Sequence, residues 1–170
     1  MSLTLNNIDK LDAKILTILQ ERGRISITEL AQMLKKPRST IRERVLKLER
    51  SGYIKGYRAI VNPEKLGYKY LAFVMLKVRR RVTTSGISNQ EEIARKVLVD
   101  AAKNPSLPFV EEAYIITGAY DIILKVWAKR WGDLTSFLIN YLASFEDIIS
   151  SETFLVLKAI SENKGVFPCK

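Results

Sequence analysis

The sequence predicts an α+β protein made of two units, three helices first and then strands and helices in the order β-α-β-β-α-β. Apolar residues at helical spacing, preceded by capping residues, fill residues 9–50. From residue 70 onward, runs of β-forming residues alternate with helical patterns. The pairs Asn62-Pro63 and Leu66-Gly67 are typical of turns and separate the two regions. The predicted domains are residues 1–61 and 70–170, joined by a hinge at residues 62–69.

The first helix is predicted for residues 9–22. Asp9 can cap its N-terminus, and a glycine at position 23 is typical of a helix end. Its spacing of apolar residues predicts one buried side. The residues expected on that side are Leu11, Ile15, Ile18 and Leu19.

Residues 26–50 predict two further helices joined by a tight turn. Ser26 and Glu29 have the spacing of a capping box, which starts the short helix that precedes the turn. The run Lys35-Lys36-Pro37 ends this helix, because proline disfavours helix in the residue before it and suits the start of a new one. In the next helix, called the recognition helix below, one apolar stripe predicts docking on the short helix that precedes the turn. The stripe is Ile41, Val45 and Leu48.

The opposite side of the recognition helix carries a dense set of polar and charged residues. A merely solvated side is one interpretation, but a helix of this size also fits the DNA major groove, and we favour DNA reading. The residues expected to contact DNA directly are Ser39, Thr40, Arg42 and Lys47, and those expected mainly on phosphates are Lys35, Lys36, Arg38 and Arg44. Glu43 is expected either to accept from a cytosine amino group or to orient Arg42 and Lys47.

The positive charge of the chain is concentrated around this helix. The net charge is +10, and residues 35–58 alone hold nine Lys or Arg against two Asp or Glu. Such a patch indicates a surface that meets phosphate, because cations release counterions from nucleic acid. A membrane-surface helix would need a wide apolar side, which here is used for docking. No apolar run approaches the roughly 18–20 residues that cross a bilayer.

Residues 53–61 (YIKGYRAIV) cluster β-forming residues around Gly56. They predict two short strands or one bent strand, which resembles a small wing beside a helix-turn-helix. From such a wing, Lys55 and Arg58 could touch the DNA backbone. The alternative is a linker strand that leads to the second domain.

The second unit is predicted as a four-stranded antiparallel sheet with two helices on one face, the split unit of a ferredoxin-like sandwich. Strands are expected at residues 70–78, 109–117, 120–128 and 153–160. One helix begins at Ser88, which has capping-box spacing to Glu91, and another begins at Asp133. Only Gly118-Ala119 separates the middle two strands, which is hairpin spacing.

The sheet has more apolar positions than one layer of helices can cover, among them Leu71, Phe73, Met75, Ile123 and Trp127. An open apolar face is normally covered by a partner, and a homodimer formed sheet against sheet is the simplest cover. A dimer would also let two recognition helices enter successive major grooves roughly 34 Å apart.

Nearly the whole chain resembles the Lrp/AsnC family, the feast/famine regulators of bacteria and archaea. The matching segments are LDAKILTILQERGRISITELA from Leu11, STIRERVLKLERSGYIKGYRAIVNPEKLG from Ser39, AYIITGAYDIILKV from Ala113 and SSETFLVL from Ser150. The resemblance implies a transcription regulator with a winged helix-turn-helix domain and a RAM-type ferredoxin-like domain. It also implies dimers, often assembled into octamers or larger discs, that bind amino acids or related small molecules between their sensing domains.

In the family, effector contacts come from a G-x-x-D turn and from the ends of neighbouring strands. The matching positions are Gly118, Tyr120 and Asp121, with Ser151 and Thr153 on the last strand. The resemblance implies that Asp121 pairs with an ammonium, while the two hydroxyls and backbone N–H groups hold a carboxylate. The alternative is that Gly118 only makes a tight turn and that Asp121 ties this turn down.

Three features depart from the family pattern. The helix-turn-helix turn usually has a glycine and then a Ser or Thr cap, so Lys35, Lys36 and Pro37 predict a turn that is built differently. Leu46 is exposed by helical phase, where it either packs on the wing or touches a thymine methyl group. The basic loop at residues 79–81 is expected to be solvated, to contact an anion or effector, or to be a second DNA surface.

The composition argues against catalysis and metal binding, because the chain has no histidine and no clustered acids. Its one cysteine, Cys169, cannot form an internal disulfide, which suits a reducing cytoplasm. No cofactor and no export signal are expected. We therefore expect a cytoplasmic, non-enzymatic regulator whose partners are double-stranded DNA, further copies of the chain and an amino-acid effector. The alternative is an architectural protein that wraps DNA without effector sensing.

Overall fold

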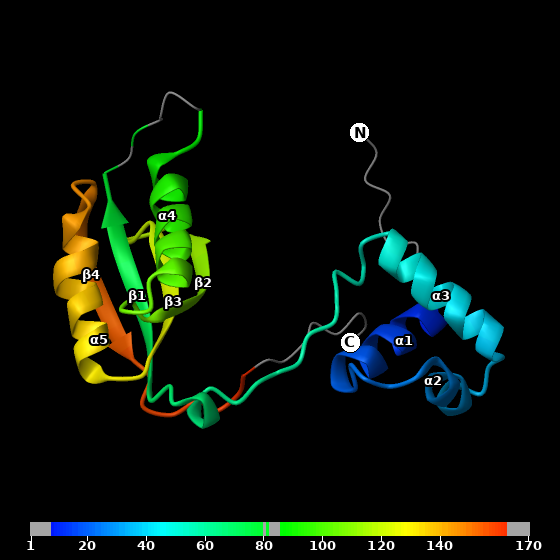
Figure 1. Cartoon of the computed structure of the whole chain (residues 1–170). Helices are drawn as coiled ribbons and strands as arrows, with labels where there is room; N and C mark the ends of the chain where they lie inside the picture. The colour runs from blue at the N-terminus through cyan, green and yellow to red at the C-terminus, as the bar shows by residue number, and fades with distance from the viewer. Residues whose placement is uncertain (1–7, 80, 82–85, 163–170) are drawn as a thin grey trace. The chain divides into compact units, whose positions relative to one another are not determined.

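The computed structural model describes residues 8–79, 81 and 86–162, which fall into two compact units (Figure 1). One unit contains the chain up to Val61, and the other is Asn62–Ile160. Each has its own apolar core. Cys169 and the rest of residues 163–170, as well as Arg80, lie outside the described residues.

The first unit consists of three helices, as predicted: α1 (Lys10–Glu21), α2 (Ile27–Leu34) and α3 (Arg38–Arg50). The Asp9 carboxylate caps α1 by accepting from the N–H groups of Leu11 and Asp12. At α2, the Ser26 hydroxyl accepts from the N–H of Glu29 at 3.1 Å, and the Glu29 carboxylate accepts from the N–H of Ser26 at 2.9 Å. These local bonds fix where the helices begin.

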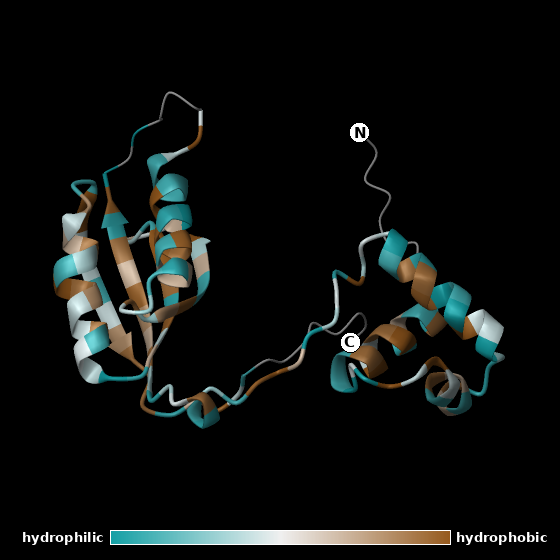
Figure 2. Cartoon of the chain, viewed as in Figure 1, coloured by the Kyte–Doolittle hydropathy of each residue, from teal (hydrophilic) through white to brown (hydrophobic). Residues whose placement is uncertain are grey.

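A small apolar core joins the three helices. Its buried members are Ile15, Leu30, Ala31, Ile41, Val45 and Leu48. The last three confirm the apolar stripe that was predicted on α3, the recognition helix. Figure 2 shows the remainder of this helix as mainly hydrophilic, so its opposite side is free of core-forming residues.

The turn between α2 and α3 contains a lysine in the left-handed conformation. Lys35 has φ 52° and ψ 48°. Its N–H donates to the carbonyl of Gln32 at 3.2 Å, and the N–H of Lys36 donates to the carbonyl of Ala31 at 3.0 Å. These two bonds are the Schellman ending that a glycine usually makes. The prediction of a differently built turn is therefore wrong at the end of α2, because Lys35 takes the glycine conformation despite its steric cost. At the start of α3 the turn does depart from the family pattern, because Pro37 occupies the N-cap position and makes no side-chain bond.

Residues 53–61 form no strand in the structure, so neither the predicted wing strands nor a linker strand is present in this segment. Ile54 packs on the core of the first unit, and its N–H donates to the carbonyl of Leu48 at 3.2 Å. The Tyr57 hydroxyl donates to the Glu49 carboxylate at 2.9 Å. The segment is therefore held by contacts to α3 and not by strand pairing.

The second unit is a four-stranded antiparallel sheet in the order β2-β3-β1-β4, which confirms the ferredoxin-like prediction. The strands are β1 (Tyr70–Val78), β2 (Phe109–Ile115), β3 (Ile122–Ala128) and β4 (Ile148–Leu155). The helices are α4 (Asn89–Lys103) and α5 (Trp131–Ser136), and α5 continues as a π-helical turn (Phe137–Tyr141) and a 3₁₀ turn (Leu142–Ser144). A 3₁₀ turn (Glu64–Leu66) precedes the sheet.

Five predicted boundaries in this unit are wrong, and one of them is the end of β4, which lies at Leu155 and not at residue 160. Strand β4 begins five residues before the predicted 153–160, because its pairing with β1 extends back to Ile148. Residues 116–121 link β2 to β3, so the connection is longer than Gly118-Ala119 alone. Helix α5 begins at Trp131, and Asp133 lies in its first turn.

The two faces of the sheet differ in how they are covered. Alternate strand residues, including Val74, Leu76 and Leu124, are buried in a core with α4 and α5. The opposite face, called the open face below, carries Leu71, Phe73, Met75, Ile123 and Trp127. Both helices of this unit pack in the core on the other face, so within its described residues no helix of the unit covers the open face.

In the described part of the chain, no helix combines the length and the apolar content that a membrane crossing requires.

Candidate functional site

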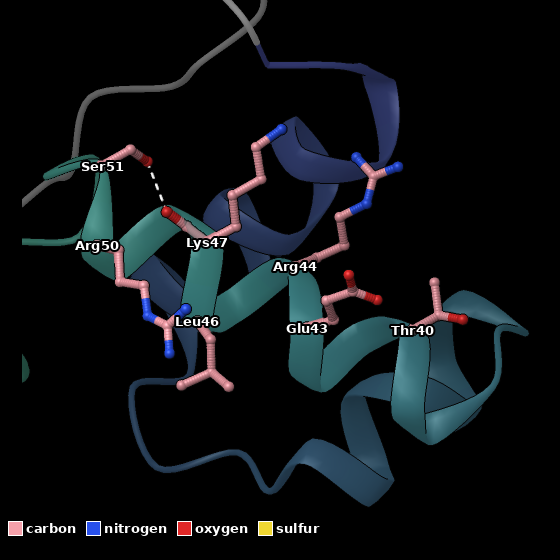
Figure 3. A pocket seen from close by; sticks show the side chains of 7 residues that line it. All are labelled: Thr40, Glu43, Arg44, Leu46, Lys47, Arg50 and Ser51. Atoms are coloured by element: carbon pink, nitrogen blue, oxygen red, sulfur yellow. Dashed lines mark hydrogen bonds between the residues drawn. The ribbon is translucent and has the colours of Figure 1, made fainter.

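The exposed side of α3 holds most of the residues predicted to bind DNA. Two open hollows lie on it. The first is lined by Thr40, Glu43, Arg44, Leu46, Lys47, Arg50 and Ser51 (Figure 3), and the second by Arg38, Ser39, Arg42, Glu43 and Leu46. Leu46 is 39% exposed and lines both. Because no strand forms at residues 53–61, the predicted packing of Leu46 on a wing is not seen.

The charged residues on this side are available to a ligand. Arg42 and Lys47 are exposed and form no ion pair within the described residues. Glu43 is exposed as well, and it pairs with neither of these two cations there. The structure therefore does not show Glu43 orienting Arg42 or Lys47. Within the described residues, one acceptor and two donors on α3 are therefore without ion-pair partners, and these are the kinds of group that base edges match.

The N-terminus of α3 adds a second attraction for anions. Pro37 occupies the N-cap position and makes no side-chain bond to the first turn. The first backbone N–H groups of α3 are therefore without a side-chain cap, and the helix dipole favours negative charge at this end. Lys35, Lys36 and Arg38 are all exposed beside it. This arrangement suits a phosphate group.

Arg44 has partners that the sequence analysis did not foresee. Its Nη1 lies 3.2 Å from both carboxylate oxygens of Asp12 and also pairs with Asp9. In Figure 3 its side chain lies on the other side of α3 from Leu46. The N–H of Asp12 and then the Arg44 guanidinium lower the pKa of the Asp9 carboxyl. This position of Arg44 could have been predicted from helical phase. Arg44 follows the buried Ile41 by three residues, so it lies at the edge of the apolar stripe that docks α3.

The predicted effector residues lie around the loop between β2 and β3. Gly118 has φ 122°, and an added Cβ would meet no atom within 4 Å. Its glycine is therefore required by backbone conformation and not by crowding. The Tyr120 hydroxyl donates to the Glu152 carboxylate on β4. Glu152 was not predicted, because only the pairing of β4 with β1 brings it near this loop.

Asp121 is fully buried and already has partners. Its Oδ2 accepts from the N–H of Val78 at 3.0 Å and lies 3.2 Å from the Nζ of Lys77. Its Oδ1 lies 3.5 Å from the Nε2 of Gln90, at the start of α4. This is the geometry of the alternative in which Asp121 ties the turn down. An ammonium ligand would have to displace Lys77 to reach the carboxylate, and effector contact by Asp121 stays a prediction.

Ser151 and Thr153 lie on β4, the edge strand, and both are exposed. They pair with Leu76 and Val74 of the neighbouring strand β1. Their neighbour Glu152 points to the other face, because side chains alternate along a strand. Tyr120 and Glu152 are thus joined to each other, whereas the two hydroxyls lie on the opposite side of β4.

Two residues of the predicted basic loop are described, and both lie near Asp147. The N–H of Arg79 donates to the carbonyl of Asp147 at 2.9 Å, and the guanidinium of Arg81 pairs with the Asp147 carboxylate. Arg81 thus has a partner inside its own unit, which reduces the charge that it offers to an anion.

Comparison with known proteins connects both units to one group of regulators. Residues 8–55 match the winged helix-turn-helix DNA-binding family, and residues 71–166 match the Lrp/AsnC ligand-binding domain. The HTH-type transcriptional regulator FL11 of Pyrococcus furiosus is 35% identical, over 91% of this chain and 93% of its own. The leucine-responsive regulatory protein of Rhizobium meliloti is 33% identical, over 91% and 92%.

Solved structures agree with these matches. Escherichia coli AsnC has a TM-score of 0.75 and 29% identity, covering 96% of this chain and 100% of its own. A transcriptional regulator of Neisseria meningitidis, solved in complex with L-Met, has a TM-score of 0.76 and 26% identity, covering 91% and 93%. The likeness extends over both units and is not confined to one of them.

Proposed function

Because the chain belongs to the Lrp/AsnC family of transcriptional regulators, we propose that α3 reads the major groove and that its exposed side supplies the contacts. The observation that supports this most is that Arg42, Glu43 and Lys47, which line the two hollows with Leu46, form no ion pair within the described residues. Ser39 and Thr40 add hydroxyls near the end of the helix that enters the groove first. Lys35, Lys36 and Arg38 bind phosphates around the uncapped N-terminus.

The test compares Arg42→Ala with Lys36→Ala. Affinity is measured on a duplex selected from a random library by the wild-type protein and on a scrambled duplex. Loss of Arg42 should weaken the selected duplex more than the scrambled one, because a base contact carries sequence information. Loss of Lys36 should weaken both alike and lower the salt slope by about one. If both variants bind as the wild type does at low salt, the assignment of α3 is wrong.

We propose further that two copies associate through the open face, and that such dimers can assemble into octamers. Support comes from its apolar residues and from the half-buried ion pair between Glu111 and Lys125, 2.9 Å apart, which a partner would shield from water. Met75→Lys should reduce the mass measured by light scattering. Ile139→Lys is the matched control, because Ile139 is 65% exposed on the helix layer. If both variants keep the mass of the wild-type protein, the open face is excluded as the surface of association.

The second unit is proposed to bind an amino acid or a related molecule near Gly118, Tyr120, Ser151 and Thr153, with Asp121 as a further candidate contact. The match to the ligand-binding domain and the L-Met complex of the Neisseria regulator support this. They also disfavour the alternative of a DNA-wrapping protein without effector sensing. Thermal-shift screening of the twenty amino acids should find one that raises the melting temperature, since a ligand of the folded state stabilises it. A screen without any shift would contradict amino-acid sensing.

We place this regulator in the cytoplasm, where it meets the chromosome, and assign it no catalytic step and no cofactor. Its named relatives are transcriptional regulators, which supports a non-enzymatic role.

A further inference from the structure

Arg44 differs from the other cations of α3 because its guanidinium is turned to α1. Nη1 lies 3.2 Å from both oxygens of the Asp12 carboxylate and also pairs with Asp9. The Asp12 side chain is only 2% exposed. A carboxylate buried to this degree requires hydrogen-bond and ion-pair partners, so removing Arg44 from it is costly.

The same two carboxylates hold the start of α1. Asp9 accepts from the N–H groups of Leu11 and Asp12 at 2.8 and 2.9 Å, and Asp12 accepts from the N–H of Asp9 at 3.2 Å. Arg44 therefore links the capped N-terminus of α1 to the middle of α3. Apolar contacts are non-directional, whereas these bonds depend on angle as well as distance. They can fix the rotation of α3 about its own axis, which a small apolar core fixes less well.

We propose that Arg44 is a positioning residue for DNA recognition and not a phosphate ligand. This inference rests on the proposed reading of DNA by α3. By holding α3 at one rotation against α1, Arg44 keeps Arg42 and Glu43 directed at base edges, whose hydrogen bonds tolerate little misplacement. Binding to arbitrary sequence requires only cations near phosphates and does not depend on this rotation.

The test compares Arg44→Ala with Lys36→Ala in the full-length chain. Fluorescence anisotropy gives the affinity for the selected and the scrambled duplex across a series of KCl concentrations. Lys36→Ala should weaken both duplexes alike and lower the slope of log K against log salt by about one. Arg44→Ala should leave this slope unchanged and reduce the ratio of specific to nonspecific affinity by roughly tenfold.

Arg44→Ala can fail to fold, so Asp9→Asn provides an independent measurement. Asparagine still caps a helix, but the change removes a negative charge that holds Arg44. Electrostatics alone would raise the affinity for both duplexes and keep their ratio. Positioning through Arg44 predicts a severalfold lower ratio, with far-UV circular dichroism showing that the helices are retained.

Two results would overturn the proposal. One is an unchanged ratio in Asp9→Asn, and the other is a slope loss of about one in Arg44→Ala with equal weakening of both duplexes. If the wild-type protein does not distinguish the two duplexes, the proposed function fails first and this inference falls with it.

Discussion

The two units hold their helices in place by different means. In the first, three helices share six buried apolar residues, and ion pairs from Arg44 to Asp9 and Asp12 join α1 to α3. In the second, fifteen described residues form a buried core between the sheet and its helices. The hydrogen bond from Tyr141 to Asp100 (2.9 Å) joins the π-helical turn that follows α5 to α4. The first unit therefore has less apolar packing behind each helix, and the orientation of α3 relies more on directional bonds.

The difference follows from what each surface has to do. Residues 1–62 carry 13 Lys or Arg against 6 Asp or Glu, whereas the rest of the chain carries 15 against 12. A helix that presents its outer side to phosphate has only its inner side left for a core. The sheet has two faces, so one can be covered by helices while the other stays apolar for a partner. Charge and apolar surface are thus divided between the units.

The largest expected effect comes from truncating one fully buried residue in each core. Ile41→Ala and Leu124→Ala should each lower the free energy of unfolding of their own unit by about 3 kcal/mol, because each leaves a cavity. Ile41→Ala should also abolish specific DNA binding, since it undocks α3. Leu124→Ala should leave binding to a single half-site intact.

Tryptophan fluorescence separates the two results during urea denaturation. The only tryptophans, Trp127 and Trp131, lie in the second unit, whereas far-UV circular dichroism follows helices of both. Ile41→Ala should shift the circular dichroism transition without shifting the fluorescence transition. Coincident shifts of both signals would show that the units unfold as one, and the comparison would fail.

A gain in stability of roughly 0.5–1 kcal/mol is expected for Lys35→Gly. Glycine adopts the left-handed conformation without the steric cost that lysine bears, although it loses more entropy on folding. The same change should weaken DNA binding at low salt, because a phosphate contact is lost. Lys35→Ala is the control, since it removes the charge and keeps the strain. A variant that gains stability without losing affinity would show that Lys35 does not contact DNA.

A similar or smaller change, about 0.8 kcal/mol or less in DNA affinity, is expected for Leu46→Ala. If Leu46 contacts a thymine methyl group, replacing that thymine by uracil in the selected duplex should weaken the wild-type protein by the same factor. The Leu46→Ala variant should then be insensitive to the replacement. Each thymine of the duplex is replaced in turn. The contact is excluded if the ratio of wild-type affinity to Leu46→Ala affinity is the same on every uracil duplex as on the original duplex.

Acid should produce the smallest effect, because Asp9 is half exposed. Its folded pKa lies below the ordinary value of 3.8, through the N–H of Asp12 and then Arg44. Ionised Asp9 therefore stabilises the first unit above about pH 4, and this contribution is lost as the pH falls through the folded pKa. The urea concentration at the midpoint of the circular dichroism transition should decrease when the pH is lowered below about 4. This decrease should be smaller in Asp9→Asn. An identical fall in both proteins would argue against the ion pair in solution.

Local signals in the sequence predicted most of the fold. Asp9, Ser26 and Ser88 each start the helix that they were expected to start, because a cap acts within three residues. Order and spacing of the elements then identified the sheet topology. Both ends of the last strand were misplaced because Val156 and Ile160 are as β-forming as Ile148 and Ile149, and only pairing with β1 chooses between the two segments.

The candidate sites were predicted less completely, since their decisive contacts join distant parts of the chain. The exposed side of α3 follows from helical phase alone. By contrast, Arg44 meets Asp12 across 32 residues, Asp121 meets Val78 across 43 and Tyr120 meets Glu152 across 32. A pattern of residue types cannot distinguish a carboxylate that awaits a ligand from one that is already paired.

The burial of Asp121 joins the loop at residues 116–121 to the middle of the sheet. Both its N–H and its carboxylate bind β1, at Leu76 and Val78. The same strand contributes Phe73 and Met75 to the open face. A molecule that displaced this loop would therefore also displace the strand on which two copies are proposed to meet. Loop occupancy and self-association would then be linked equilibria, in which each changes the constant of the other by the same factor.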